Sequence, residues 1–190
     1  MPTIVGTEGD DVLFGTNARD VIVGLGGNDV IHGKNGPDVI CGGPGDDELR
    51  GGRDNDLIYG GTGNDLIKGG RNNDRLFGED GQDVMFGNNG RDTMSGGNGD
   101  DIARGNGGRD VMNGGAGADY LAGNSDVDRL MGDGADDVLL GGSHNDQLNG
   151  GSGRDACAGG SGADSSAGCE TQPATSVDLY DTTRDDGNLD

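Results

Sequence analysis

Aspartate recurs at every ninth residue through most of this 190-residue chain. Consecutive nine-residue blocks run from Gly6 to Ala167, and each begins with Gly and carries Asp at its sixth place, without insertion or deletion. The recurring residues are Asp11, Asp20, Asp29, Asp38, Asp47, Asp56, Asp65, Asp74, Asp83, Asp92, Asp101, Asp110, Asp119, Asp128, Asp137, Asp146, Asp155 and Asp164. Carboxylates are hard oxygen ligands, and Ca²⁺ takes about six to eight oxygens from carboxylates and backbone carbonyls. This spacing predicts a repeated cation site.

The other places of each block indicate which elements position these carboxylates. The eighth place is apolar in nearly every block and is predicted to point inward, whereas the seventh and ninth places face solvent. The fourth place is mostly Gly, Asn, Asp or His, which tolerate positive φ. Ala18 and Ala135 are the two awkward exceptions. We interpret places one to six as a tight turn and places seven to nine as a strand.

Two turns and two strands make one coil of eighteen residues, since two blocks are needed to return to the same edge. The sequence therefore predicts an all-β fold, a parallel β-roll or two-sheet β-solenoid of about nine coils. Residues 3–5 fit a preceding strand, residues 6–167 hold the repeats, and residues 1–167 form one domain. Alternate aspartates would then stack into two columns, one headed by Asp11 and the other by Asp20.

Such columns need a cation, because carboxylates repeated about every 5 Å repel one another. Calcium suits carboxylate and carbonyl oxygens, whereas magnesium wants a stricter octahedron and zinc wants His and Cys. The gaps between coils allow at most about 16 ions, with the weakest sites near Ala18 and Ala135. For any single Asp, the alternative is a turn residue that caps its own backbone. With 35 acidic residues, 13 basic residues and 29% hydrophobic residues, the chain also needs metal binding to supply folding free energy.

A run such as Gly60–Lys68 fits the pattern GGxGxDxUx, in which U is a large apolar residue, and the pattern recurs across residues 6–167. The chain thereby resembles RTX, or hemolysin-type, calcium-binding repeat proteins. The resemblance implies a parallel β-roll in which the Asp carboxylates and loop carbonyls hold calcium between adjacent turns. It also implies a chain that is disordered in low-calcium cytosol and folds after export, hence an extracellular, secreted location.

Cys157 and Cys169 bracket the last repeat, and this stretch resembles the C-terminal closure of many secreted repeat proteins. A disulfide there would clamp the last coil; the alternative is two free thiols. Cys41 is left over. Residues 168–190 are predicted to be a C-terminal closure followed by a disordered acidic tail, which is also a candidate export signal. Residues 1–6 lack the basic and apolar regions of a signal peptide, and no stretch is apolar enough to span a membrane.

No catalytic motif is found, and His32 and His144 occupy repeat places that favour structural roles, so no enzyme is predicted. The predicted function is calcium binding by a structural or binding module. The alternatives are a detached accessory domain of a larger secreted enzyme and a surface adhesion or matrix protein. Strong acidity disfavours nucleic acid as a partner. Outward apolar residues in the N-terminal half are a candidate contact for a second copy or an upstream domain: Val12, Phe14, Val21, Val23, Val30, Val39, Leu57 and Tyr59.

Overall fold

The computed structural model describes residues 3–170. The regular secondary structure in that range consists of β-strands only. The strands are β1 (Ile4–Val5), β2 (Val12–Phe14), β3 (Val21–Val23), β4 (Val30–Asn35), β5 (Val39–Pro44), β6 (Glu48–Arg53), β7 (Leu57–Thr62), β8 (Leu66–Arg71), β9 (Arg75–Asp80), β10 (Val84–Asn89), β11 (Thr93–Asn98), β12 (Ile102–Gly107), β13 (Val111–Ala116), β14 (Tyr120–Ser125), β15 (Arg129–Gly134), β16 (Val138–Ser143), β17 (Gln147–Ser152), β18 (Ala156–Ser161) and β19 (Ser165–Ala167). No helix long and apolar enough to cross a membrane occurs among these residues.

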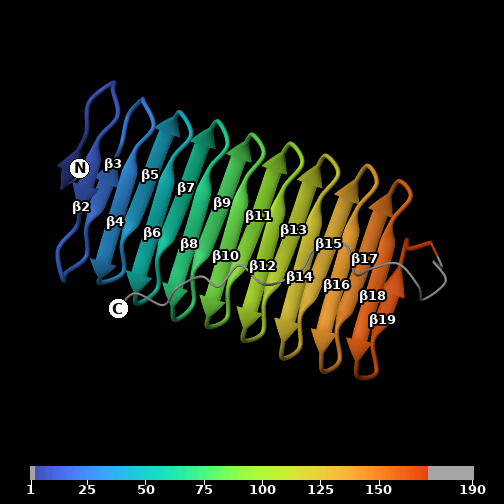
Figure 1. Cartoon of the computed structure of the whole chain (residues 1–190). Coiled ribbons are helices and arrows are strands. Elements are labelled where there is room, and N and C mark those ends of the chain that lie inside the picture. The colour runs from blue at the N-terminus through green and yellow to red at the C-terminus, as the bar shows by residue number, and fades with distance from the viewer. Residues whose placement is uncertain (1–2, 171–190) are drawn as a thin grey trace, which may run out of the picture.

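The strands form two parallel sheets that face each other along the whole rod (Figure 1). The odd-numbered strands make a 10-stranded sheet, the odd sheet, and the even-numbered strands make a 9-stranded sheet, the even sheet. Each strand pairs with the strand one coil away, so that Ile31 on β4 lies opposite Leu49 on β6, eighteen residues later. The predicted β-solenoid of about nine coils is confirmed.

One apolar side chain per block fills the space between the sheets, as the eighth place predicts. These residues are almost completely buried: Ile22, Ile31, Ile40, Leu49, Ile58, Ile67, Leu76, Met85, Met94, Ala103, Met112, Leu121, Leu130, Leu139 and Leu148. Leu13 and Cys157, nearer the ends, are only partly buried, and Ser166 in the last strand is exposed. The core therefore weakens at both ends of the rod.

The predicted division of each block into a six-residue turn and a three-residue strand is wrong for most of the rod. From β4 to β18 each strand has six residues and continues through places one to three of the next block, as in Leu57–Thr62. The turn is confined to places four to six. It can be this short because the backbone takes positive φ twice, at place two (Gly61, φ 127°) and at place four (Gly63, φ 121°). A positive φ was predicted at place four but not at place two.

The two doubtful turns differ from each other. Ala135 does take a positive φ, 74°, which is a strained conformation for a residue with a Cβ. Ala18, which was predicted to fit a left-handed turn poorly, does not take one. This turn lies in the first coil, made by the first two blocks, where β2 and β3 have only three residues and the side chain of Thr16 bonds to Ala18 and Asp20.

The two ends of the described rod are built differently. At the N-terminal end, Ile4 and Val5 pair with Ile22 and Val23, which confirms the predicted first strand. At the C-terminal end, a disulfide joins Cys157 to Cys169, with Cα atoms 5.8 Å apart. Cys41 is a free thiol. The predicted tail from residue 171 onward lies outside the described residues.

The outward apolar residues of the N-terminal half are less exposed than predicted. Val12 and Phe14 are exposed, whereas the other six, from Val21 to Tyr59, are half-buried by their neighbours on the same face. The ring of Phe14 stacks on His32, with centroids 5.3 Å apart. A second copy or an upstream domain as the partner of this surface therefore remains only a prediction.

Candidate metal centres

The predicted aspartates lie in two buried columns, one at each edge of the rod, where the chain enters the next strand. From Asp29 to Asp164, each carboxylate accepts the backbone N–H of the Asp eighteen residues earlier through its Oδ1 atom, at 2.7 to 2.9 Å. Asp11, Asp29 and Asp47 begin one such ladder, and Asp20, Asp38 and Asp56 begin the other. Each carboxylate is thus fixed by the coil that precedes it.

The second oxygen of most of these carboxylates is buried and has no hydrogen-bond partner. This holds for the Oδ2 atoms of Asp29, Asp38, Asp47, Asp56, Asp65, Asp74, Asp83, Asp92, Asp101, Asp110, Asp119, Asp128, Asp137, Asp146 and Asp155. A buried carboxylate oxygen without a donor or a cation costs several kcal/mol, and native proteins hold only a few such atoms per hundred residues. A periodic row of such oxygens fits a repeated cation site.

The first-place glycine of each block leaves room beside the orphaned oxygen. A Cβ added at Gly24 would overlap both Oδ2 of Asp29 and the carbonyl oxygen of Gly42 in the next coil. The same convergence recurs at Gly51, between Asp56 and Gly69. The strand pairing also skips this place, since Phe86 pairs with Arg104 and Asn88 with Asn106 while the glycine between them is passed over. A carboxylate oxygen and a carbonyl oxygen from successive coils therefore face one small space.

Burial raises the pKa of the columnar carboxyl groups from Asp29 to Asp146 when no cation is present, and repulsion between neighbouring carboxylates adds to this rise in most of them. The pKa of Asp74 rises to about 8, chiefly because burial disfavours its charged form, and the neighbouring charges of Asp92 and Asp56 raise it further. The N–H of Asp56 opposes this rise only in part. The pKa of Asp56 rises to about 7 and that of Asp38 to about 6, again mainly through burial. A cation bound beside these carboxyl groups would therefore favour their ionised form.

The first two columnar residues differ from the rest. Oδ2 of Asp11 accepts the backbone N–H and hydroxyl of Thr7 at 2.6 and 2.9 Å, and Oδ2 of Asp20 accepts those of Thr16 at 2.7 and 2.9 Å. The N–H of Thr16 is the main reason that the pKa of Asp20 is lowered. At the other end of the rod, Asp164 is only partly buried. Sequence reasoning missed these Thr residues, although Thr at place two occurs only in the first two blocks.

The donor set fits calcium better than a transition metal. Within residues 3–170, no three His, Cys, Asp or Glu side chains lie together as a metal-binding group. Each space instead offers a carboxylate oxygen with backbone carbonyls, a hard, all-oxygen environment that suits Ca²⁺ and not Zn²⁺.

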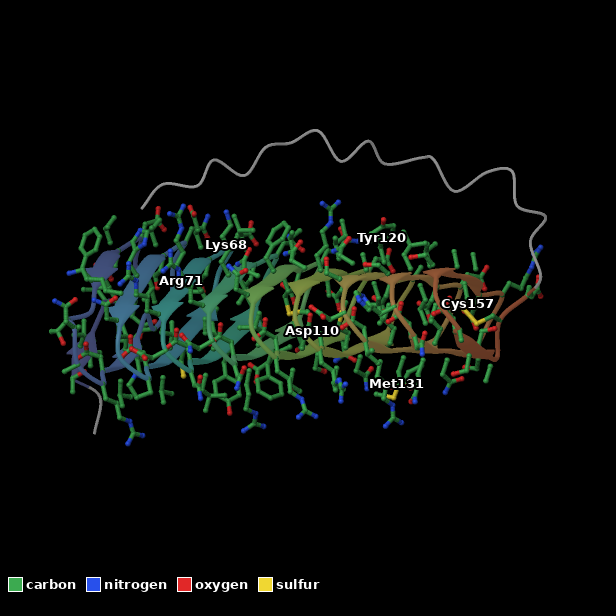
Figure 2. The ribbon with its side chains drawn as sticks, turned by 90° about the horizontal axis from the view of Figure 1, so that it is seen from below. Lys68, Arg71, Asp110, Tyr120, Met131 and Cys157 are labelled. Atoms are coloured by element: carbon green, nitrogen blue, oxygen red, sulfur yellow. A yellow bond between two sulfur atoms is a disulfide. The ribbon has the colours of Figure 1, made fainter. Side chains whose placement is uncertain are left out.

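His32 lies on an outer face and His144 has positive φ (82°) in a turn, which agrees with structural roles. Figure 2 places Asp110 between the face that carries Lys68 and Tyr120 and the opposite face that carries Met131.

Comparison with known proteins agrees with this geometry. The model of the RTX calcium-binding nonapeptide repeat matches the chain seven times, at residues 5–40, 32–67, 42–76, 59–94, 95–130, 122–157 and 131–165. No curated protein matches the chain. The matches run through almost the whole of the described rod and share its nine-residue period. The chain belongs to the family of proteins built from RTX calcium-binding nonapeptide repeats, whose β-roll is a structural calcium-binding fold.

Proposed function

We propose that this chain is a non-catalytic structural and binding module that folds outside the cell when Ca²⁺ enters between its stacked turns. The row of orphaned Oδ2 atoms carries the proposal. In the folded rod these carboxylates are buried, close together and short of one partner each. Calcium supplies the missing positive charge and takes several oxygens at once. Its binding free energy is then part of the folding free energy.

The ligands we propose are the columnar carboxylates together with first-place carbonyls from the following coil. All the columnar aspartates from Asp11 to Asp164 are candidates by position, and those with an orphaned Oδ2 are the strongest. Asp11 and Asp20 already have hydrogen-bond donors at Oδ2, and Asp164 lies at the open end of its column. With about one columnar carboxylate per ion, affinity should resemble that of extracellular calcium modules, roughly 10⁻⁴–10⁻³ M.

An extracellular location is supported by two observations. Proteins with RTX repeats are typically secreted. The disulfide between Cys157 and Cys169 is also a bond that persists in oxidising compartments and is rare in reducing cytosol. Extracellular calcium is millimolar, which matches the proposed affinity range.

A calcium titration followed by circular dichroism tests the proposal. We expect little β signal in chelator, a cooperative gain near millimolar Ca²⁺, and a much weaker response to Mg²⁺ because Mg²⁺ keeps its own water. Equal β structure in chelator and in calcium would contradict the proposal.

Adjacent residues provide a matched pair of variants. Asp47→Asn keeps the Oδ1 acceptor for Asp29 but removes a buried charge whose Oδ2 is orphaned. Asp46→Asn changes the same charge on an exposed neighbour whose Oδ1 accepts from Asn64. The first change should raise the calcium midpoint, and the second should leave it nearly unchanged. Equal midpoints for the two variants would show that the columns are not the calcium sites.

A further inference from the structure

The first two blocks turn differently from all the later ones. From the third block onward, the backbone takes positive φ at both place two and place four, as at Leu25 (84°) and Gly27 (105°). In the first two blocks neither place does so. These two blocks are also the ones that carry Thr at place two, Thr7 and Thr16. We call residues 6–11 and 15–20 the Thr turns.

In each Thr turn the threonine binds the columnar carboxylate of its own block. The backbone N–H and the hydroxyl of Thr16 both donate to Oδ2 of Asp20, at 2.7 and 2.9 Å, and Thr7 makes the same two bonds to Asp11. The hydroxyl oxygen of Thr16 in turn accepts the N–H of Ala18 at 3.1 Å, which holds the side chain in place. These carboxylates thus have the donors that the orphaned Oδ2 atoms of the later blocks lack.

The threonine donors and a cation compete for the same atom. Two donors occupy both lone pairs of Oδ2 in Asp20, so a cation would have to displace one of them. Hydrogen bonds to an ionised carboxylate are roughly twice as strong as those between neutral groups. Oδ1 of Asp20 also accepts the hydroxyl of Thr3, at 3.1 Å. Asp20 is buried like its successors in the column, yet protein donors alone satisfy it.

The other contacts of the first coil are also independent of an ion. β1 pairs with β3 at the end of the rod marked N in Figure 1. The N–H of Thr3 donates to the carbonyl of Val21 at 2.7 Å, and that of Gly6 donates to the carbonyl of Val23 at 2.8 Å. Ile22 is fully buried in the core. Hydrogen bonds and apolar packing therefore close this coil.

The first coil positions the first orphaned carboxylate of each column. The N–H of Asp11 donates to Oδ1 of Asp29, and the N–H of Asp20 donates to Oδ1 of Asp38, both at 2.8 Å. Asp29 and Asp38 are the first residues of their columns whose Oδ2 has no partner. An ordered first coil therefore holds one oxygen of each carboxylate while the other stays open to a cation.

We propose that Thr7 and Thr16 take the place of calcium in the first coil, and that the rod orders from this end as calcium rises. The proposal rests on the proposed function, because a substitute for calcium matters only where the rest of the rod needs the ion. The threonines set where ordering begins, and the columnar carboxylates bind the ions that extend it.

The first pair of coils needs fewer ions than a pair in the middle of the rod. A single coil buries too little apolar area to persist alone, so ordering begins with two neighbouring coils. In the middle of the rod such a pair carries four orphaned carboxylates: Asp65, Asp74, Asp83 and Asp92. The first pair carries only Asp29 and Asp38, because the first coil has the Thr donors. Each further coil then adds onto an ordered neighbour.

The other end of the described rod lacks this arrangement. Oδ2 of Asp155 is buried without a partner, and Ser166 at the core place of the last block is exposed. The disulfide of Cys157 and Cys169 ties the backbone there but supplies no donor to the carboxylates. The two ends therefore differ in their need for calcium, which gives the rod a direction.

Amide hydrogen exchange of the full chain, at a series of free calcium concentrations, tests the proposal. Peptides from residues 3–41 report the first two coils, and peptides from β9 to β13 report the middle of the rod. We expect residues 3–41 to reach half of their protection at a free calcium concentration about twofold or more below that of the middle. Simultaneous protection of the two regions, or earlier protection of the middle, would overturn the proposal.

Replacement of both threonines by Gly distinguishes a substitute for calcium from a purely structural bond. Gly can take the positive φ of the later blocks, and a block with Gly at this place leaves Oδ2 orphaned, as Gly52 does for Asp56. Thr7→Gly with Thr16→Gly should therefore abolish the early protection of residues 3–41, and saturating calcium should restore their protection. Early protection that persists, or protection that saturating calcium does not restore, would refute the substitution of calcium by threonine.

Two further double variants are the controls. Thr7→Ser with Thr16→Ser keeps both hydroxyls and should keep the early protection. Thr62→Gly with Thr93→Gly makes the same change of residue type at exposed positions of β7 and β11, and should leave the half-protection concentration of residues 3–41 unchanged. An equal loss of early protection in this pair would mean that added flexibility alone explains the effect, and would refute the role of the hydroxyls.

Circular dichroism in chelator and in saturating calcium reports the overall fold of each variant separately. A rod that is equally folded in both conditions contradicts the proposed function. A rod that folds only with calcium but shows no early protection at its N-terminal end contradicts only the role of the threonines.

Discussion

The backbone N–H of Asp56 donates a 2.8 Å hydrogen bond to Oδ1 of Asp74, while Oδ2 of Asp74 is buried without a partner. One oxygen of the side chain therefore holds two coils together, and the other is left for a ligand. Because these two tasks belong to different atoms, they can be separated by substitution.

Asp74→Asn should keep the bond to Asp56 and weaken calcium binding. The amide oxygen still accepts the N–H, but the charge that attracts the cation is lost. We expect a higher calcium midpoint, with the variant at least as structured as the parent in chelator because a buried repulsive charge has been removed. Circular dichroism during a calcium titration measures both. Asp54→Asn, which changes an exposed turn residue, is the control, and a midpoint shift as large in the control would contradict the assignment.

The metal-free rod should be most stable in acid. The folded-state pKa values of Asp38, Asp56 and Asp74 are raised to about 6, 7 and 8, above the ordinary value of 3.8 for an Asp side chain. A raised pKa means that the folded form binds protons more tightly than the unfolded form. Protonation of these carboxyl groups therefore stabilises the fold below about pH 4, and this stabilisation is lost as the pH rises toward 8. In chelator, β signal should therefore fall as the pH increases over this range.

With calcium present, the pH dependence should reverse. Protons compete with the cation for the same carboxylates, so apparent calcium affinity should fall as the pH drops from 8 to 5. Titrations at fixed ionic strength across this range measure the effect. A calcium midpoint that does not change with pH would count against carboxylate ligands.

Gly51→Ala should damage the rod more than alanine at a nearby glycine. The new Cβ would collide with the carboxylate of Asp56 and the carbonyl of Gly69, the two oxygens that face the proposed site. Gly107→Ala is the matched control, because its Cβ would meet nothing closer than 3.6 Å and neither glycine has positive φ. Thermal unfolding in calcium should show a lower midpoint for Gly51→Ala only, and a similar loss in both variants would refute the crowding argument.

Removal of the disulfide should affect mainly the C-terminal end. A crosslink that closes a short loop contributes about 3 kcal/mol in the chain-entropy model, and here it ties β18 to the residues after β19. Cys157→Ser with Cys169→Ser should increase amide hydrogen exchange in β17 to β19 while β7 to β11 keep their protection. Cys41→Ser is the control, because Cys41 is a free thiol that lies far from the C-terminal end of the rod. Uniform loss of protection would contradict a local clamp.

Much of the fold followed from the period alone, because an invariant block length leaves few ways to stack the chain. Place eight predicted the core from Ile22 to Leu148, and place six predicted the two columns. Strand length could not be predicted, because Gly at places one and two is compatible with either a turn or a strand. The hydrogen bonds of Thr7 and Thr16 were also missed, since they depend on a turn conformation confined to the first coil.

The two aspartate ladders connect each coil only to its immediate neighbours, as in the bonds from Asp29 to Asp47 and from Asp146 to Asp164. A damaged coil therefore has no long-range contact to compensate for it, and it becomes a boundary between two segments that can melt separately. A single substitution in the middle of the rod should thus split one unfolding transition into two, whereas the same substitution near an end should only shorten the folded part.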